Sequence, residues 1–190
     1  MVFEKKEKDR PTQEKELNLT EFTRMLDSIK KNIKEDTGNI NVYLAIQTII
    51  QSKNPEFMFI TADELQNSYP IQNLDRTIAK IENPEWCYMM ARYVKGCDKK
   101  MQGLAVIHSK DPCWNYLFAK DIPEANKEEH LQVVLNSKHP RWNFESAMNI
   151  EGADTTEHGK AIEASNSAYY KQEFKNHFGS PDTKEKSIQI

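Results

Sequence analysis

Two acid–histidine pairs are the residues of this chain best suited to chemistry. Glu129-His130 and Glu157-His158 lie 28 residues apart. If the helices that carry them were neighbours, about 8–10 Å apart, the two imidazoles could share a metal ion. The matching position one period earlier holds Gln102, and two histidines without a third ligand make a poor zinc site. We therefore favour a solvated helix face that happens to repeat, and we predict no metal site.

The other reactive residues are scattered. Cys87, Cys97 and Cys113 are odd in number and lack Cys-x-x-Cys spacing, which favours reduced, buried and inert thiols. The sequence shows no Ser-His-Asp or Cys-His grouping and no glycine-rich phosphate loop. It predicts no catalytic residue, no cofactor and no enzyme activity.

Recurring rings and cations suggest a different chemistry, the binding of nucleic acid. The recurring rings are Trp86, Trp114, Trp142, Tyr88 and Tyr116. The recurring cations are Lys53, Lys110 and Lys138, with Arg141 nearby. Such rings can stack on bases, but they also suit a core between repeats. We favour core for the tyrosines and leave the tryptophans open. Glu82 interrupts the lysine row, so a solvated edge is the simpler interpretation.

These residues recur because the chain itself repeats. Four prolines, Pro55, Pro84, Pro112 and Pro140, follow one another in steps of 29, 28 and 28 residues. Asn or Asp precedes the first three and His139 the fourth, so each proline opens a helix that is capped in the first three repeats. Apolar residues four, seven and ten positions later form a helical stripe, and the seventh is always alanine. A fixed period of this size is typical of stacked repeats.

A turn and a second helix complete each repeat. The predicted second helices cover residues 72–81, 99–108, 127–136 and 155–164, with Leu104, Leu131 and Ile162 on their apolar faces. Helices are also expected over 18–33 and 41–51, and a polar half repeat over 167–178 suits the cap of a stack. The predicted fold is all-α, an α-solenoid of stacked antiparallel helix pairs with degenerate capping repeats.

Composition limits the class of protein. The 190 residues carry a formal net charge of −3, so no global field favours nucleic acid or anionic membrane. No apolar run approaches the roughly 20 residues that cross a bilayer, which predicts a cytoplasmic protein with no membrane contact. We expect one repeat domain over residues 17–178. The ends, residues 1–16 and 179–190, bury too little apolar surface to order and are predicted to be disordered.

The repeat is written Ser-Lys-Asp-Pro-x-Trp-x-Tyr-x-x-Ala, followed by Ile-x-x-Ala-Asn/Asp. Over residues 52–165 it resembles short α-helical repeats of bacterial and bacteriophage proteins, similar in kind to HEAT-like and tetratricopeptide solenoids. The resemblance implies a recognition surface and no catalytic residue. By analogy with phage proteins of this size, it also implies an inhibitor that occludes a host defence protein such as a CRISPR nuclease, in a bacterial cytoplasm.

The predicted function is therefore a non-enzymatic protein-interaction module. Its partner-binding residues are expected at exposed positions that vary between repeats: Arg92, Lys120, Asp121, Glu145 and Asn149 on first helices, and Gln102, His130 and His158 on second helices. The alternative is nucleic-acid binding through Lys53, Lys110, Lys138, Arg141 and exposed aromatic rings. Pairing of terminal repeats in a homodimer stays open.

Overall fold

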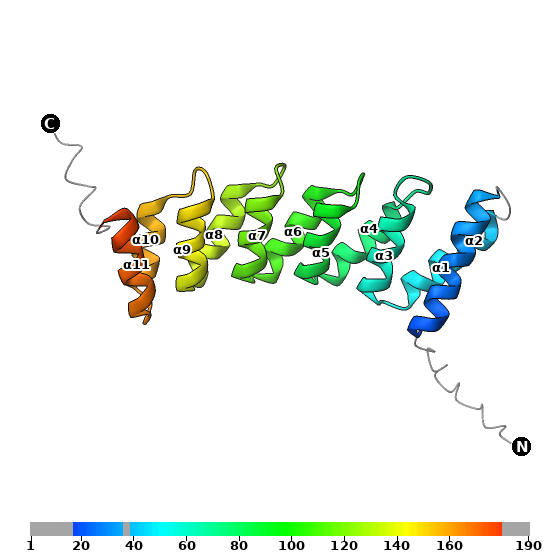
Figure 1. The fold of residues 1–190 in the computed structure, drawn as a ribbon, viewed down its shortest axis with the longest axis horizontal. Coiled ribbons are helices and arrows are strands. Elements are labelled where there is room, and N and C mark those ends of the chain that lie inside the picture. The colour runs from blue at the N-terminus through cyan, green and yellow to red at the C-terminus, as the bar shows by residue number, and fades with distance from the viewer. Residues whose placement is uncertain (1–16, 36–38, 180–190) are drawn as a thin grey trace, which may run out of the picture. The chain divides into compact units, whose positions relative to one another are not determined.

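The computed structural model describes residues 17–35 and 39–179, and these form eleven α-helices and no strand (Figure 1). The chain divides into two compact units, residues 1–52 and 53–190. The prediction of an all-α solenoid is confirmed. The prediction that one domain covers residues 17–178 stays a prediction. Those for the two ends lie outside the described residues, apart from Gly179.

The first unit contains a helical hairpin of α1 (Leu19–Lys34) and α2 (Asn39–Gln51). Its first helix begins with a capping box, in which Asn18 Oδ1 accepts a hydrogen bond from the Glu21 backbone N–H at 3.0 Å. The two helices bury apolar stripes: Phe22, Leu26 and Ile29 on α1, and Val42, Ile46 and Ile49 on α2. Leu19, the first residue of α1, is 66% exposed.

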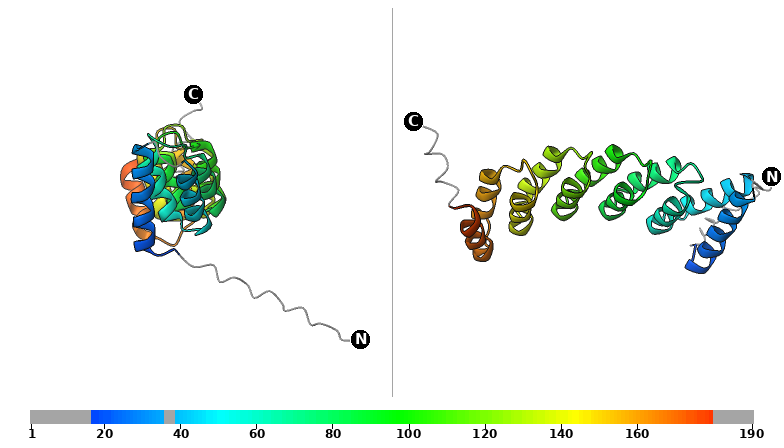
Figure 2. Two further views of the ribbon diagram at one scale, coloured as in Figure 1. Left: turned by 90° about the vertical axis from the view of Figure 1, so that its right-hand side faces the viewer. Right: turned by 45° about the horizontal axis from the view of Figure 1, so that its top comes forward.

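The second unit is a stack of helical hairpins. Its helices are α3 (Pro55–Leu65), α4 (Gln72–Ile81), α5 (Pro84–Tyr93), α6 (Lys99–Ser109), α7 (Pro112–Asp121), α8 (Lys127–Ser137), α9 (Pro140–Asn149), α10 (Thr155–Glu163) and α11 (Ala168–Phe178). Each first helix contacts the next one along, from α3 through α5, α7 and α9 to α11. The second helices α4, α6, α8 and α10 do the same, so the stack has two layers (Figures 1 and 2).

Small residues let the helices of each hairpin approach closely. Ala62, Ala91, Ala119 and Ala147, the alanines seven positions after each proline, are all buried, as predicted. The residues ten positions after each proline, Leu65, Val94, Ile122 and Ile150, are buried too. On α6 the sequence assigned one residue wrongly: Leu104 is 43% exposed, and Ala105 and Val106 form the core instead. The 28-residue period already indicated this, because it aligns Leu104 with Gln132 and Lys160.

A four-residue turn joins successive hairpins, and each of its residues has one task. Between α6 and α7, Ser109 Oγ donates to the Val106 carbonyl at 2.7 Å and closes the helix. Lys110 then adopts the left-handed conformation, with φ of +57°. Asp111 Oδ1 caps α7 by accepting from the backbone N–H groups of Cys113 and Trp114. Pro112 occupies the first helical position, where no donor is needed.

The left-handed residue explains why lysines recur at the turns. Lys53, Glu82, Lys110 and Lys138 all have φ between +52° and +57°. Their shared feature is a backbone conformation at the end of a helix, and a side chain with a Cβ is strained there. These lysines therefore recur because they occupy equivalent positions of the turn, and their recurrence is not by itself evidence of a binding site.

We predict that Lys110→Gly and Lys138→Gly each raise the free energy of unfolding by about 0.5–1 kcal/mol. Relief of the left-handed strain, about 1–2 kcal/mol, exceeds the extra chain entropy that glycine loses. Urea denaturation measures the change. The matched control is Lys127→Gly at the start of α8, which should lower stability by up to about 1 kcal/mol. Equal destabilisation by both changes would contradict the role assigned to the turn.

Aromatic rings link each repeat to the next. Trp86 packs on Phe59, Trp114 on Tyr88 and Trp142 on Tyr116, with ring centroids 5.5–5.6 Å apart. Tyr170 of the half repeat packs on Phe144 in the same way, at 5.9 Å. Tyr88 and Tyr116 are buried, as predicted, whereas the three tryptophans are half-buried. The tryptophans thus belong to the contact between repeats.

Trp114→Ala should lower the free energy of unfolding by about 2–3 kcal/mol, somewhat less than the loss expected for a fully buried ring, because part of its surface already faces water. Thermal or urea unfolding monitored by circular dichroism measures it. Tyr43→Ala, which removes a ring that is 50% exposed, serves as control and should cost no more than about 0.5 kcal/mol. Equal small losses would mean that the Trp114 ring adds nothing to the stack.

Candidate functional site

The histidines of the two acid–histidine pairs are buried, and each takes part in a hydrogen-bonded cluster that connects three helices. His130 on α8 is 1% exposed, and its Nδ1 lies 2.8 Å from Asn115 Oδ1 on α7. Asn115 Nδ2 donates to two carbonyls, that of Val106 on α6 at 3.0 Å and that of Asp111 at 2.8 Å. One asparagine therefore ties the end of α6 to α7 and α8.

The asparagine also fixes the state of the histidine. Both hydrogens of Asn115 Nδ2 are used, so its Oδ1 accepts and His130 Nδ1 carries the proton of a neutral imidazole. The His130 ring stacks on Phe118 with centroids 4.7 Å apart. Gly103 on α6 faces this stack, and a Cβ there would lie 3.1 Å from the Phe118 ring.

The next repeat contains the same bridge. His158 Nδ1 lies 2.8 Å from Asn143 Oδ1, and Asn143 Nδ2 donates to the carbonyls of Val134 and His139. One repeat earlier, Gln102 takes the place of the histidine. Gln102 Nε2 donates to the Asp75 carboxylate at 2.6 Å and to the Asp75 carbonyl at 2.9 Å.

Three of the predicted partner-binding residues are therefore interior. Gln102, His130 and His158 were expected to be exposed, and each is at most 1% exposed. The interpretation of the two histidines as a solvated face is wrong as well. The sequence did contain a signal: both histidines follow an asparagine by 15 residues, whereas Gln102 follows Cys87 at that spacing. Within this chain asparagine and histidine change together, as hydrogen-bonded partners do.

Burial sets the proton affinity of both histidines. Desolvation lowers the pKa of His130 from 6.5 to about 4. It lowers the pKa of His158 to about 4 too, although the carboxylates of Asp154 and Glu157 act in the opposite direction. His158 Nε2 has no hydrogen-bond partner among the described residues, so a proton there would create an unpaired buried charge.

We predict that stability falls as the pH drops from about 6.5 to about 4. The unfolded chain binds protons on these histidines in that range and the folded chain does not, which costs about 1.4 kcal/mol per pH unit and histidine. Urea denaturation between pH 7 and pH 4 (roughly the window that the two pKa values define) measures the slope.

The control is the double variant His130→Gln/His158→Gln, which installs the residue that the chain itself uses at position 102. Burial raises the pKa of Asp75, which stabilises the folded chain in acid, and both proteins retain that residue. The double variant should therefore show a flatter profile than the parent. Parallel profiles would contradict the assignment of the slope to the histidines.

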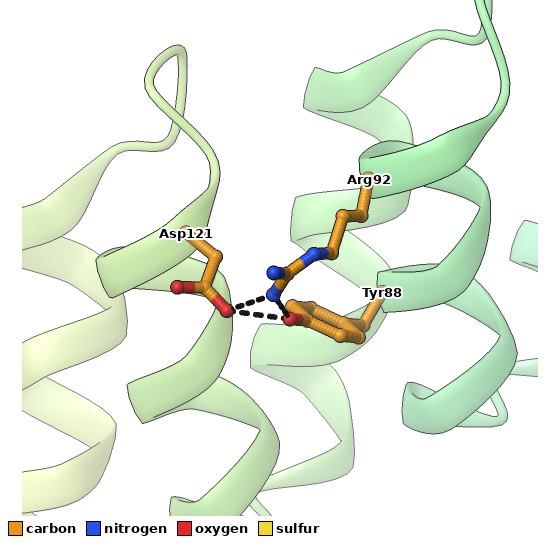
Figure 3. Close-up of polar contacts among 3 residues, drawn as sticks. All are labelled: Tyr88, Arg92 and Asp121. Atoms are coloured by element: carbon orange, nitrogen blue, oxygen red, sulfur yellow. Dashed lines mark hydrogen bonds and ion pairs between the residues drawn. The ribbon is translucent and has the colours of Figure 1, made fainter.

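A polar cluster on the first-helix layer joins α5 to α7 (Figure 3). Tyr88 Oη donates to Asp121 Oδ2 at 2.5 Å, and the Arg92 guanidinium donates to both Tyr88 and Asp121. Burial, followed by the bond to Asp121, raises the pKa of Tyr88 to about 12, so the phenol keeps its proton. Two predicted partner-binding residues, Arg92 and Asp121, thus bind each other across a repeat boundary.

The same cluster recurs one period later in weaker form. Lys120 Nζ lies 5.4 Å from the centre of the Tyr116 ring, and Asn149 Nδ2 donates to Tyr116 Oη at 3.3 Å. Asn149 also donates to Glu145 Oε2 at 2.9 Å. All five predicted residues of the first-helix layer therefore take part in contacts within or between repeats, although Arg92, Lys120 and Asn149 remain exposed.

The cations of the nucleic-acid alternative do not converge on one site. Lys53, Lys110 and Lys138 each follow a different second helix, and Glu82 occupies the equivalent turn between Lys53 and Lys110. Arg141 lies over the Trp142 ring, 4.5 Å from its centre. The three tryptophans each have another ring packed against them.

The thiols are held in the interior or half-buried. Cys87 Sγ lies 3.8 Å from the Ile78 carbonyl, the position that Asn115 and Asn143 occupy in later repeats. Burial raises the pKa of Cys87 and of Cys97 to about 12 and also raises that of Cys113. The thiols therefore stay protonated near neutral pH, which agrees with the prediction of inert cysteines.

Grooves lie between neighbouring second helices of the stack. Between α4 and α6 a groove of about 350 Å³ has an apolar floor that includes Ala79, Met101 and Leu104. Arg76, Lys80 and Lys100 line it, and none makes an ion pair with a described residue. Two further grooves, of about 360 and 660 Å³, lie between α6 and α8. Sequence analysis did not single out any of these cations.

Comparisons with protein families, curated proteins and solved structures give no match. Within residues 17–35 and 39–179, no three histidine, cysteine or acidic side chains gather as metal ligands do. In the same part of the chain, none of the helices combines the length and the hydropathy needed to cross a bilayer.

Proposed function

We propose that this chain is a non-catalytic protein-binding module that acts by covering or scaffolding a partner. One observation carries the proposal: His130, His158 and Cys87 are used inside the stack, whereas three cations on the outward side of α4 and α6 make no ion pair with a described residue. His130, His158 and Cys87 bond to neighbouring helices. By contrast, Arg76 and Lys100 flank the exposed side chain of Leu104.

Stacked helical repeats support this function because their layers offer extended surfaces to a partner. Core positions repeat along the chain, while surface positions such as Arg76 and Lys100 do not. A surface that differs from repeat to repeat can recognise one partner and reject others. Nucleic-acid binding is the weaker candidate, because its predicted cations lie at separate turns and the net charge is −3. The narrower prediction of an inhibitor that occludes a CRISPR nuclease or another host defence protein stays a prediction.

The test is a pull-down of the tagged full-length chain from bacterial lysate, with and without nuclease, analysed by mass spectrometry. We expect a protein recovered in near-stoichiometric amount in both samples, and its identity tests the narrower prediction. A tagged, unrelated helical protein of similar charge serves as the control. Recovery of nucleic acid alone, lost on nuclease treatment, would contradict the proposal.

A further inference from the structure

We propose that the groove between α4 and α6 binds an acidic amphipathic helix of a partner protein. The inference rests on the proposed function and assigns it a place and a ligand chemistry. It combines three features of the groove: cations without an ion pair among the described residues, an apolar floor with an exposed leucine, and a departure from the repeat pattern at those positions.

The cations lie on both walls. Arg76 and Lys80 come from α4, one helical turn apart, and Lys100 comes from the first turn of α6. Two carboxylates also line the groove, but both have partners. Asp98 caps α6 through the Met101 backbone N–H, and Glu82 lies 3.8 Å from His108 Nδ1, where it forms an ion pair when that histidine is protonated. The three cations outnumber the two carboxylates, so the groove favours an anionic ligand.

The floor between these walls is apolar. Leu104 is 43% exposed, and Ala79, Met101 and Ala105 lie beside it. A volume of about 350 Å³ accommodates a few aliphatic side chains of a docked helix. Apolar side chains on one face and carboxylates on its flanks are the pattern that such a groove selects.

The combination of three cations with an exposed leucine does not recur at the equivalent positions of the later second helices. Along the 28-residue period, Arg76 aligns with Leu104, Gln132 and Lys160. Lys80 aligns with His108, Asn136 and Ala164, and Lys100 aligns with Glu128 and Thr156. The buried positions keep their apolar character over the same span. The stack therefore does not require a cation or an exposed leucine at these positions.

An acidic helix fits better than a nucleic acid, which is also anionic. A charged phosphate backbone bound to the cations would make no favourable contact with the apolar side chains of Leu104 and Met101. The His108 imidazole is the one ring in the lining, and no phenylalanine, tyrosine or tryptophan lines the groove to stack on a base. A helix with leucines and glutamates satisfies both the floor and the walls.

The test uses fluorescence anisotropy with a labelled peptide of about 18 residues, with leucines at helical spacing and glutamates elsewhere. The full-length chain should bind it, and added salt should weaken the complex. The same peptide with lysines in place of the glutamates should not bind. Arg76→Glu/Lys100→Glu should weaken binding about 10-fold or more.

The matched control is Lys127→Glu/Lys171→Glu, which makes the same change in net charge at positions of the stack that do not line the groove and should alter the dissociation constant less than about 2-fold. Leu104→Ser, at an exposed position that needs no repacking, should weaken binding without changing the charge. Circular dichroism confirms that each variant is folded. Equal losses in both double variants, or no loss with Leu104→Ser, would overturn the assignment.

Two further outcomes would also overturn it. One is a single-stranded oligonucleotide that binds this groove more tightly than the acidic peptide. The other is self-association, seen by analytical ultracentrifugation, that Arg76→Glu/Lys100→Glu abolishes. The pull-down separates this inference from the proposed function. If the Arg76→Glu/Lys100→Glu variant still recovers the partner, the protein-binding function holds and the groove is not its binding site. If the parent protein recovers no partner, the proposed protein-binding function itself is contradicted.

Discussion

The central repeats depend on how one backbone carbonyl near the end of α6, and its equivalent in α8, is satisfied. The Val106 carbonyl accepts hydrogen bonds from Ser109 and from Asn115 of the next helix. The Val134 carbonyl accepts from Ser137 and Asn143 in the same way. Since a buried carbonyl without a partner is costly, these bonds set where the second helix stops and where the next hairpin begins. Lys110 and Lys138, which lie between the serine and the next helix, adopt the left-handed conformation at this point of the turn.

The buried bridges extend that link across the two layers. His130 ties α8 to an asparagine that already joins α6 and α7, so three helices share one polar cluster. On the first-helix layer, Tyr88, Arg92 and Asp121 join α5 to α7 (Figure 3). Neighbouring repeats are thus held by specific polar contacts as well as by apolar packing, and these contacts fix the register of one repeat on the next.

The division between interior and surface has a functional consequence. His130, His158, Cys87 and Tyr88 bond to other residues of the stack. On the outward side of the second helices, the groove between α4 and α6 combines Arg76, Lys80 and Lys100 with the exposed Leu104. The stability of the array and the chemistry of its surface are set by different residues, so the surface can change while the fold is kept.

The sequence by itself determined the architecture, because caps, prolines, the alanine stripe and the 28-residue period are local and repeat along the chain. Asn54, Asn83 and Asp111 cap their helices, and the boundaries of α4, α6, α8 and α10 differ from the predicted ones by one residue at most. The sequence could not decide which way a polar residue faces. His130 and His158 are interior and Leu104 is exposed, because the packing of α6 between α4 and α8 decides which side of each helix meets water. The cations of the groove come from two hairpins, so only the tertiary structure brings them together.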